Sequence, residues 1–271
     1  MNKSSDKPVM VFEGHADEAS PLTLPHGEVV YFSTRSPVKE TPNEDAIGVI
    51  PVNEQTTVLV VADGMGGMPA GEQAARIIVE TMVDTMEQKP EEQLMRDAIL
   101  TGIDAANSNI KDLRNGAGST VSVVEVSGSQ MRSYHAGDSL ILLTSSHGNI
   151  KYLSMSHSPI GYALECGAID QVPAMMHDER NLISNYVGMQ EMFIHIGPII
   201  DMAPQDTVIV ASDALSDNLY EQEISEYIRK GPLLESVNEM IEACEDNMLN
   251  MVPDRRCHPD DFSFICFRTN S

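Results

Sequence analysis

The chain is short of basic residues, and this shortage is its first informative feature. Only 17 of its 271 residues are Lys or Arg, against 41 Asp and Glu, so the formal net charge is −24. A surface of that sign repels a phosphate backbone, and we therefore expect no nucleic-acid partner. Most of the acidity is expected to be solvated surface, and part of it is available for divalent cations.

Cysteine is scarce, and long apolar runs are absent. The four cysteines form no CxxC pair, which excludes a structural zinc ribbon and a dense disulfide framework, and the eight histidines show no HxxxH or HExxH spacing. No apolar run approaches the ~20 residues of a membrane span. The first 26 residues are polar, are interrupted by Pro8, Pro21 and Pro25, and lack the apolar region of a secretory signal. We expect a cytoplasmic protein with reduced thiols and no membrane contact.

Length and apolar content together predict one enzyme-sized domain. At 271 residues and 42% hydrophobic, the chain can bury a substantial core, and it has no internal repeat or low-complexity linker. We expect a polar N-terminal segment over residues 1–27 and a single domain over residues 28–271. An irregular surface flap is expected around residues 154–187, where glycine and proline are frequent.

Strand-like and helix-like periodicities occur in separate blocks along the chain. Strands are predicted near residues 29–32, 47–52, 58–62, 120–126, 131–135, 140–143, 150–153, 193–196, 207–211 and 262–267, and helices near 75–86, 95–113, 221–229 and 233–249. Consecutive strands on short turns must be antiparallel. The pattern predicts an α+β sandwich, with antiparallel sheets inside and helices outside.

Acidic residues recur where apolar runs end. In the clearest case the run 58–62 is followed by Asp63, with glycines behind it that let this carboxylate face a cation without crowding. Further carboxylates at such ends are Glu44, Asp45, Asp138, Asp213, Asp260 and Asp261. Each alone has an ordinary explanation as a cap, a turn residue or the start of a strand. Together they favour a site for hard divalent ions, which in pairs lie ~3.5–4 Å apart.

Six segments resemble, in order, the motifs of the PP2C-type metal-dependent protein serine/threonine phosphatases, the PPM family, in its bacterial branch. They are NEDA at 43–46, VVADGMGGMPAGEQAA at 60–75, GST at 118–120, HAGDS at 135–139, VASDALSDNL at 210–219 and DDFSFICF at 260–267. The segment at 177–188 is also similar to the stretch that follows the flap in bacterial members. The resemblance covers roughly residues 28–267.

The resemblance implies a PP2C-like four-layer α-β-β-α sandwich, in which helix pairs flank two antiparallel sheets and a dinuclear Mn²⁺ or Mg²⁺ site lies at one edge. By position, Asp63 would bridge the two ions and the Gly64 carbonyl would bind one of them. Asp213 and Asp260 would complete the shell of the other ion. These three aspartates are the implied catalytic residues.

The resemblance also implies weaker ligands and a reaction. Glu44 and Asp45 would bind through water molecules, and Asp138 would help to hold a third ion. The implied activity is hydrolysis of phosphoserine and phosphothreonine in proteins by a hydroxide that bridges the metals, which agrees with general metal-assisted phosphoryl chemistry. A phosphoprotein is then the substrate, a cognate serine/threonine kinase is a candidate partner, and a monomer is expected.

Three positions depart from the pattern of the family. The arginine that usually stands four residues before the first motif's glutamate is Glu40 here, so that Arg35 or Lys39 is left as the candidate phosphate-binding residue. Ala214 replaces a usual glycine, which matters only where the backbone needs a positive φ. Met65 stands where the eukaryotic branch has a histidine, as in bacterial relatives.

Other interpretations of the same residues are weaker. The glycines after Asp63 do not fit a P-loop, because Glu72 and Gln73 stand where Lys and Ser or Thr are required. Ser119 and Thr120 lack a neighbouring histidine or aspartate, which favours a turn role, and His135 is expected to be a packed residue. The main alternative function is a catalytically inactive, PP2C-like regulatory or binding module, for which the missing arginine argues.

Overall fold

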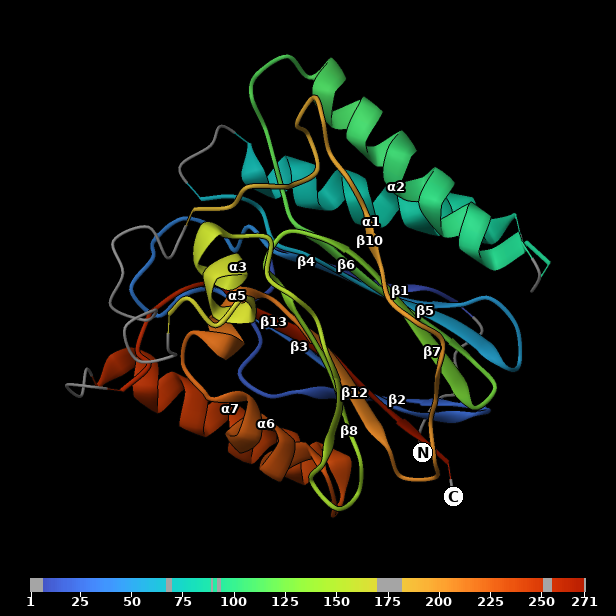
Figure 1. Cartoon of the computed structure of the whole chain (residues 1–271), viewed down its shortest axis with the longest axis vertical. Coiled ribbons are helices and arrows are strands. Elements are labelled where there is room, and N and C mark those ends of the chain that lie inside the picture. Colours follow the sequence, from blue (N-terminus) through green and yellow to red (C-terminus); the bar gives the residue numbers. More distant parts are fainter. Residues whose placement is uncertain are drawn as a thin grey trace.

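Two antiparallel sheets stack face to face, and helices cover their outer faces (Figure 1). The protein is described here by a computed structural model covering residues 7–66, 70–88, 90–91, 94–169, 182–250 and 255–270. The predicted α+β class and the four-layer α-β-β-α sandwich are confirmed. The strands next to Asp63, Asp213 and Asp260 contribute side chains to the interface between the sheets.

The first sheet has the order β1-β4-β5-β6-β7-β10, and β11 also pairs with β7. Its strands are β1 (Val9–Phe12), β4 (Ala46–Pro51), β5 (Thr56–Ala62), β6 (Val121–Ser127), β7 (Gln130–Ala136), β10 (His195–Ile196) and β11 (Ile200–Asp201). The second sheet has the order β2-β3-β13-β12-β8-β9. Its strands are β2 (Ser20–Leu24), β3 (Gly27–Thr34), β13 (Phe262–Thr269), β12 (Thr207–Ala211), β8 (Leu140–Thr144) and β9 (Ile150–Leu153).

Helices α1 (Gly71–Glu87) and α2 (Met95–Asp112) cover the first sheet, and α6 (Glu221–Ile228) and α7 (Leu233–Leu249) cover the second (Figure 1). Each turns a stripe of apolar residues inward, as the helical spacing predicts. Two shorter helices are α3 (Pro159–Glu165) and α5 (Asp213–Ser216). None of the helices in the described ranges is long and apolar enough to cross a membrane.

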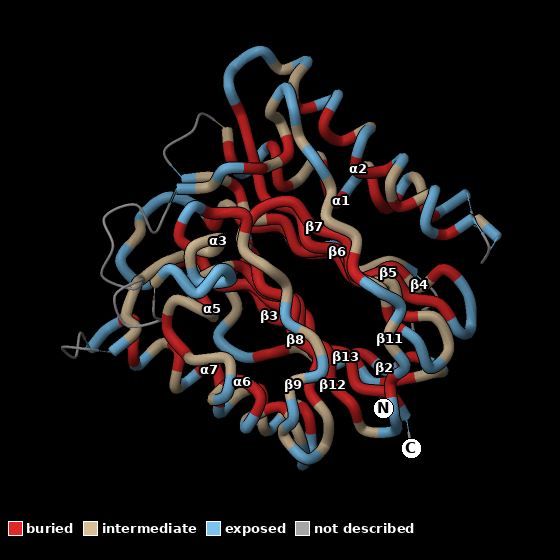
Figure 2. Tube along the Cα trace, in the orientation of Figure 1, coloured by how far each residue is buried: buried red, intermediate tan, exposed pale blue. Residues whose placement is uncertain are grey.

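Three apolar layers hold the sandwich together, and Figure 2 shows the buried backbone that runs through them. Strand β5 illustrates how one strand serves two of these layers. Val60 packs toward α1 and α2, whereas the next residue, Val61, packs between the sheets. Because both faces of β5 are buried, its sequence is a continuous apolar run and does not alternate.

The N-terminal residues belong to the sandwich, although no strand is predicted from the sequence before residue 28. Strand β1 pairs with β4, and β2 pairs with β3. Pro21 lies in β2, an edge strand, where its missing N–H costs no internal ladder bond. A boundary at residue 27 therefore does not separate the described part of this segment from the rest.

The region expected to be an irregular flap begins with helix α3. Ser158 caps it by accepting a hydrogen bond from Gly161 N at 2.9 Å, and Pro159 occupies the first turn. The prediction of an irregular flap did not include this cap. Residues 170–181 of the expected flap lie outside the described residues.

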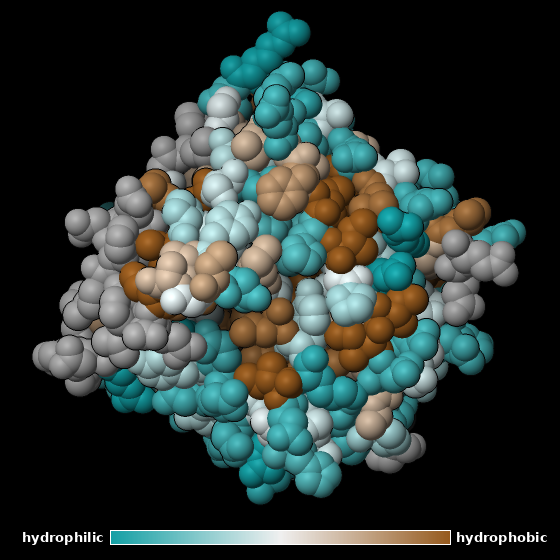
Figure 3. Space-filling view, viewed as in Figure 1, coloured by the Kyte–Doolittle hydropathy of each residue, from teal (hydrophilic) through white to brown (hydrophobic). Residues whose placement is uncertain are grey.

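The chain returns to the first sheet through the short strands β10 and β11. Exposed apolar side chains accompany this return, among them Phe193 (50% exposed) and Ile199 (55% exposed). Figure 3 shows apolar surface gathered in the middle of the face on which β10 lies in Figure 1, with hydrophilic residues around it. These strands lie at the edge of the sheet, so one side of them has no neighbouring strand to cover it.

Candidate active site

The end of strand β5 is fixed in place by the residues that precede β6. The Asp63 amide donates to Thr120 Oγ1 at 3.1 Å, and the Asp63 carbonyl accepts from Thr120 N and from Ser119 Oγ, each at 2.8 Å. Both backbone groups of Asp63 are therefore held, which leaves its side chain free to point away from the sheet. Ser119 and Thr120, for which a turn role was predicted, thus hold the backbone of Asp63 by hydrogen bonds.

Glycine is required directly after Asp63. A Cβ atom on Gly64 would lie 2.5 Å from the Gly71 carbonyl group and 2.6 Å from the Glu44 carbonyl oxygen. Because these neighbours are backbone atoms, they have little freedom to yield. The glycine thus allows the start of α1 and the loop before β4 to approach the turn that carries Asp63.

The loop before β4 presents Asp45 through a local turn. Asn43 Oδ1 accepts from Asp45 N at 2.8 Å, and Asn43 Nδ2 donates to Ser33 Oγ at 3.1 Å. Asn43 and Asp45 are both buried, at 1% and 2% exposed. The Asn-Glu-Asp order therefore has a structural basis, because the asparagine shapes the turn that aims the aspartate.

Asp138 is aimed by a second tight turn. Gly137 before it has a φ of 121°, and a Cβ there would lie 2.6 Å from the Thr120 side chain. Ser139 after it forms a 2.7 Å hydrogen bond with Thr120 Oγ1. Thr120 consequently joins the turn of Asp63 to the turn of Asp138.

Strands β12 and β13 supply the remaining carboxylates. Asp213 is the first residue of α5, which begins directly after β12, with Ser212 at the N-cap. Asp260 lies just before β13, and its Oδ1 accepts from Asp261 N at 2.7 Å. Since β12 and β13 are paired neighbours, their ends bring these two residues to the same edge of the second sheet.

Five of the acidic residues singled out in the sequence converge into one group, here called the carboxylate cluster. Its members are Asp45, Asp63, Asp138, Asp213 and Asp260. Burial raises the pKa of Asp63 well above its usual range, and the charges of the other four raise it further. Burial is also the first cause that raises the pKa of each of the others, and for Asp138 it does so to about 7.

The cluster has the donors that a hard divalent cation needs. Among the described residues, the buried atoms Asp45 Oδ2 and Asp138 Oδ1 have no hydrogen-bond partner. Buried carboxylate oxygens without partners are costly unless a cation binds them, and an all-oxygen set suits Mg²⁺ or Mn²⁺. The residues therefore fit such ions on chemical grounds.

Within the described ranges, the ammonium group of Lys39 borders the cluster. Lys39 Nζ donates to Asp261 Oδ2 at 2.7 Å and also to Glu44 Oε2. Burial would lower the pKa of Lys39, but the hydrogen bonds and charges of these two carboxylates outweigh it, so the pKa is raised and the side chain stays charged. The other candidate, Arg35, donates from Nη1 to the Glu40 carbonyl at 3.1 Å. Of the two, Lys39 has its charged group next to acidic residues of the site.

Comparison with known proteins shows which family the chain belongs to. The profile of the family described as protein phosphatase 2C matches residues 34–252. This chain belongs to the protein phosphatase 2C family. It is accordingly a protein phosphatase, a hydrolase, of the type found in bacteria.

Curated relatives and solved structures agree with this membership. The serine/threonine phosphatase stp of Listeria monocytogenes serotype 4b (strain F2365) is 26% identical over 234 residues, which are 79% of this chain and 90% of the relative. Protein phosphatase PhpP of Streptococcus pneumoniae is 26% identical over 204 residues, 70% of this chain and 80% of the relative.

The serine/threonine phosphatase PstP/Ppp of Mycobacterium tuberculosis superposes with a TM-score of 0.75 at 22% identity, over 91% of this chain and 100% of that chain. A structure of the PstP catalytic domain in complex with two manganese ions has a TM-score of 0.72 at 21% identity, over 91% and 99% of the two chains.

The structure shows the consequence of two positions that depart from the pattern of the phosphatase 2C family. Ala214 lies in helix α5 and is not one of the described non-glycine residues with a positive φ, so the missing glycine imposes no strain. Met65 donates its backbone N–H to Gly118 O at 3.1 Å, and its thioether has no proton to give. A leaving group must take its proton from another source.

Two acidic residues beside the carboxylate cluster had no individual role assigned from the sequence. Asp217 was not among the carboxylates singled out in the sequence, but its charge is the first electrostatic contribution, after burial, to the raised pKa values of Asp138 and Asp213. Its spacing of four residues from Asp213, one helical turn, was the available signal. Asp261 was noted beside Asp260, but its contact with Lys39 joins residues 222 positions apart and cannot be derived from local sequence.

Three histidines near the cluster do not form a suitable metal site, even though ligand atoms of His135, His157 and His195 lie within 4.8 Å of one another. His157 Nδ1 accepts from Gly137 N at 3.2 Å and from Asn185 Nδ2 at 2.9 Å, so the proton of the neutral ring is on Nε2. The rings of His135 and His157 stack at 19°, which keeps their in-plane nitrogens from converging. His135 is a packed residue, as predicted.

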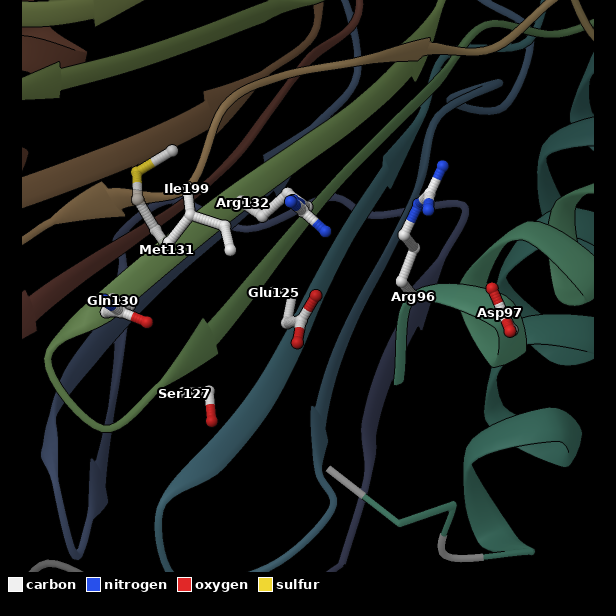
Figure 4. Close-up of a pocket in the computed structure, with 8 residues that line it drawn as sticks. All are labelled: Arg96, Asp97, Glu125, Ser127, Gln130, Met131, Arg132 and Ile199. Atoms are coloured by element: carbon white, nitrogen blue, oxygen red, sulfur yellow. The ribbon is translucent and has the colours of Figure 1, made fainter. Parts of the chain in front are cut away.

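A cleft of about 360 Å³ lies at the other end of the first sheet. Figure 4 shows side chains from α2 facing those of β6 and β7. Its lining residues are Arg96, Asp97, Glu125, Ser127, Gln130, Met131, Arg132 and Ile199. Thr56, at the start of β5, pairs with Ser127, so this cleft lies about 20 Å from Asp63 at the usual rise per strand residue. It is separate from the carboxylate cluster.

Proposed function

We propose that this chain hydrolyses phosphoserine and phosphothreonine in proteins and that it does so with two divalent cations, Mn²⁺ or Mg²⁺. The observation that carries the proposal is the carboxylate cluster, in which aspartates from five separate segments raise one another's pKa values. Like charges gathered in this way are stable only with cations between them or with protons bound. The manganese ions in the related PstP domain support the first possibility.

The roles follow from the position of each residue. We infer that Asp63 would be a ligand shared by the two cations, and that the Gly64 carbonyl and the carboxylates of Asp213 and Asp260 would supply further ligands. When bound, such cations lower the pKa of coordinated water and neutralise the charge of the phosphoryl group. The chain itself holds the ligands rigidly, because both backbone groups of Asp63 are hydrogen-bonded.

Further roles concern the edge of the site. We infer that Glu44 and Asp45 would bind cations through water, and that Asp138, with the neighbouring Asp217, would help to hold a third ion. Lys39 is the better candidate for the phosphate-binding cation, because its ammonium group borders the cluster. The substrate would be a phosphoprotein, the opposing enzyme a serine/threonine kinase, and the acting species a cytoplasmic monomer.

The alternative of an inactive regulatory module is not favoured. It would explain the absent arginine at Glu40, but it gives no reason for a cluster of five carboxylates in which Asp45 and Asp138 each have a buried oxygen without a partner. A protein without bound cations would be more stable with neutral residues at these positions.

The proposal is tested by hydrolysis of a small aryl phosphate and of a phosphothreonine peptide, with Mn²⁺ and with chelator. We expect turnover that needs the metal, and loss of that turnover in Asp63→Asn with the fold retained by circular dichroism. Turnover that ignores the chelator, or equal activity of the variant, would contradict the mechanism. Mn²⁺ binding without any turnover would instead support the inactive module.

A further inference from the structure

Asp261 lies next to Asp260 but binds a different set of groups. Its Oδ1 accepts from Ser36 N at 2.9 Å, and its Oδ2 accepts from Glu44 N at 2.8 Å and from Lys39 Nζ at 2.7 Å. The side chain is only 4% exposed. Asp261 therefore fastens the loop between β3 and β4 at three points, and one of these is the charged end of Lys39.

Only a carboxylate satisfies these partners. All three are N–H donors and they use both oxygens of Asp261, so an asparagine would turn its own N–H₂ toward a donor in either orientation. The charge also matches, because the ammonium of Lys39 balances the carboxylate that holds it. Asp261 and Lys39 are thus complementary in geometry and in charge.

The ammonium of Lys39 retains capacity for a ligand. It has three N–H donors, and within the described part of the chain two of them have acceptors, on Asp261 and Glu44. Its side chain is 23% exposed, so this group is reachable from solvent. Glu44 precedes Asp45 of the carboxylate cluster, so the ammonium lies at the border of the cation site.

We propose that Asp261 is the positioning residue that holds the Lys39 ammonium where it can bind an oxygen of the substrate phosphate. The proposal rests on the phosphatase function inferred above, and it assigns to this chain a lysine–aspartate pair in place of the absent arginine. Asp261 does not touch the substrate and acts only through Lys39.

A double-mutant cycle tests this dependence. KM and kcat for an aryl phosphate, and the inhibition constant of inorganic phosphate, are measured at saturating Mn²⁺ for the full chain and for Lys39→Met, Asp261→Asn and the double variant. Loss of a charge-assisted hydrogen bond predicts a rise of about 10- to 100-fold in both KM and the phosphate inhibition constant for Lys39→Met. Asp261→Asn should raise both by about 10-fold, and in the Lys39→Met background it should add nothing.

The chain offers a matched control. Lys151 and Asp206 form a pair of the same kind, with Nζ and Oδ2 at 2.8 Å and the aspartate 2% exposed. Asp206 immediately precedes β12, at the opposite end of that strand from Asp213. Asp206→Asn should therefore lower stability without changing KM or phosphate inhibition.

The outcomes separate the two proposals. If the wild-type chain shows no chelator-sensitive turnover, the phosphatase function itself fails, and the positioning role fails with it. If the wild type is active, three results overturn the positioning role alone. The first two are an unchanged KM and a lower KM in Asp261→Asn. The third is that Asp261→Asn raises KM by the same factor in the Lys39→Met background as in the wild type. Should Asp261→Asn not fold, Asp261→Ser, which keeps a small acceptor, takes its place in the cycle with the same expected dependence on Lys39.

Discussion

The substitution Asp138→Asn should make the metal-free protein more stable at alkaline pH. Burial, followed by the charges of Asp217 and Asp260, raises the pKa of Asp138 from 3.8 to about 7. The folded, metal-free chain therefore binds this proton more tightly than the unfolded chain does. Its free energy of unfolding must fall as the pH rises from about 4 through about 7.

The size of the effect follows from the shift. Each pKa unit corresponds to about 1.4 kcal/mol, so a shift of roughly 3 units costs up to about 4 kcal/mol once the pH exceeds 7. Asparagine carries no charge and removes this cost. We expect the metal-free variant to exceed the wild type in unfolding free energy by up to about 4 kcal/mol at pH 8, and by much less near pH 5.

The assay is urea unfolding in the presence of chelator at pH 5 and pH 8. Asp84→Asn serves as the control, because this substitution removes the same formal charge from an exposed residue on α1. Excess Mn²⁺ should reverse the order of stability, because it binds the folded wild type more tightly than the variant.

The reasoning is refuted if the difference between Asp138→Asn and wild type is the same at both pH values. It is also refuted if the metal-free variant is the less stable protein at pH 8. Either result would mean that burial and the neighbouring charges do not raise the pKa of Asp138 in the folded state.

Three further predictions concern the support of the site. Thr120→Val removes the acceptor of the partly buried Asp63 amide, so urea unfolding should show a loss of about 1–3 kcal/mol in unfolding free energy, and calorimetry should show a weaker Mn²⁺ affinity. Unchanged values of both would contradict this role of Thr120. Burial lowers the pKa of His135 to about 4 and that of His157 to about 3, so the unfolding free energy should fall as the pH drops below about 6.5. In acid titrations, His157→Gln should reduce this loss of stability. Gly64→Ala places a Cβ 2.5 Å from backbone atoms and should lower the melting temperature by an amount equivalent to about 1–3 kcal/mol or more; a neutral result would show that the turn can relax.

The long, strongly patterned elements could be predicted from the sequence. Strand β12 and helix α7 have the predicted bounds of 207–211 and 233–249, because β12 is a continuous buried apolar run and α7 buries a regular apolar stripe. The strands β1 and β2 were missed, since a short strand with polar neighbours, or with a proline such as Pro21, has no clear periodicity of its own. They exist because β4 and β3 offer them an edge to pair with.

The convergence of the carboxylates was predictable where these residues stand at the ends of apolar runs. Asp63, Asp213 and Asp260 each follow or precede such a strand, and the convergence of these strands brings their carboxylates together. Lys39 and Asp261 are different, because they meet only through the folding of a loop against a distant strand. Sequence alone offered Arg35 and Lys39 as equals, and the contact between Lys39 and Asp261 distinguishes them.

The bridge between Ser119 and Val187 limits how this protein can be re-engineered. The amide and the carbonyl of Ser119 both bond to Val187, at 3.1 and 2.9 Å, while the Ser119 hydroxyl holds the Asp63 carbonyl. A chimera that imports the segment after α3 from another phosphatase must consequently reproduce the backbone path at position 187. If the graft shifts that path by even one residue, the disturbance passes through a single serine to the aspartate at the centre of the site.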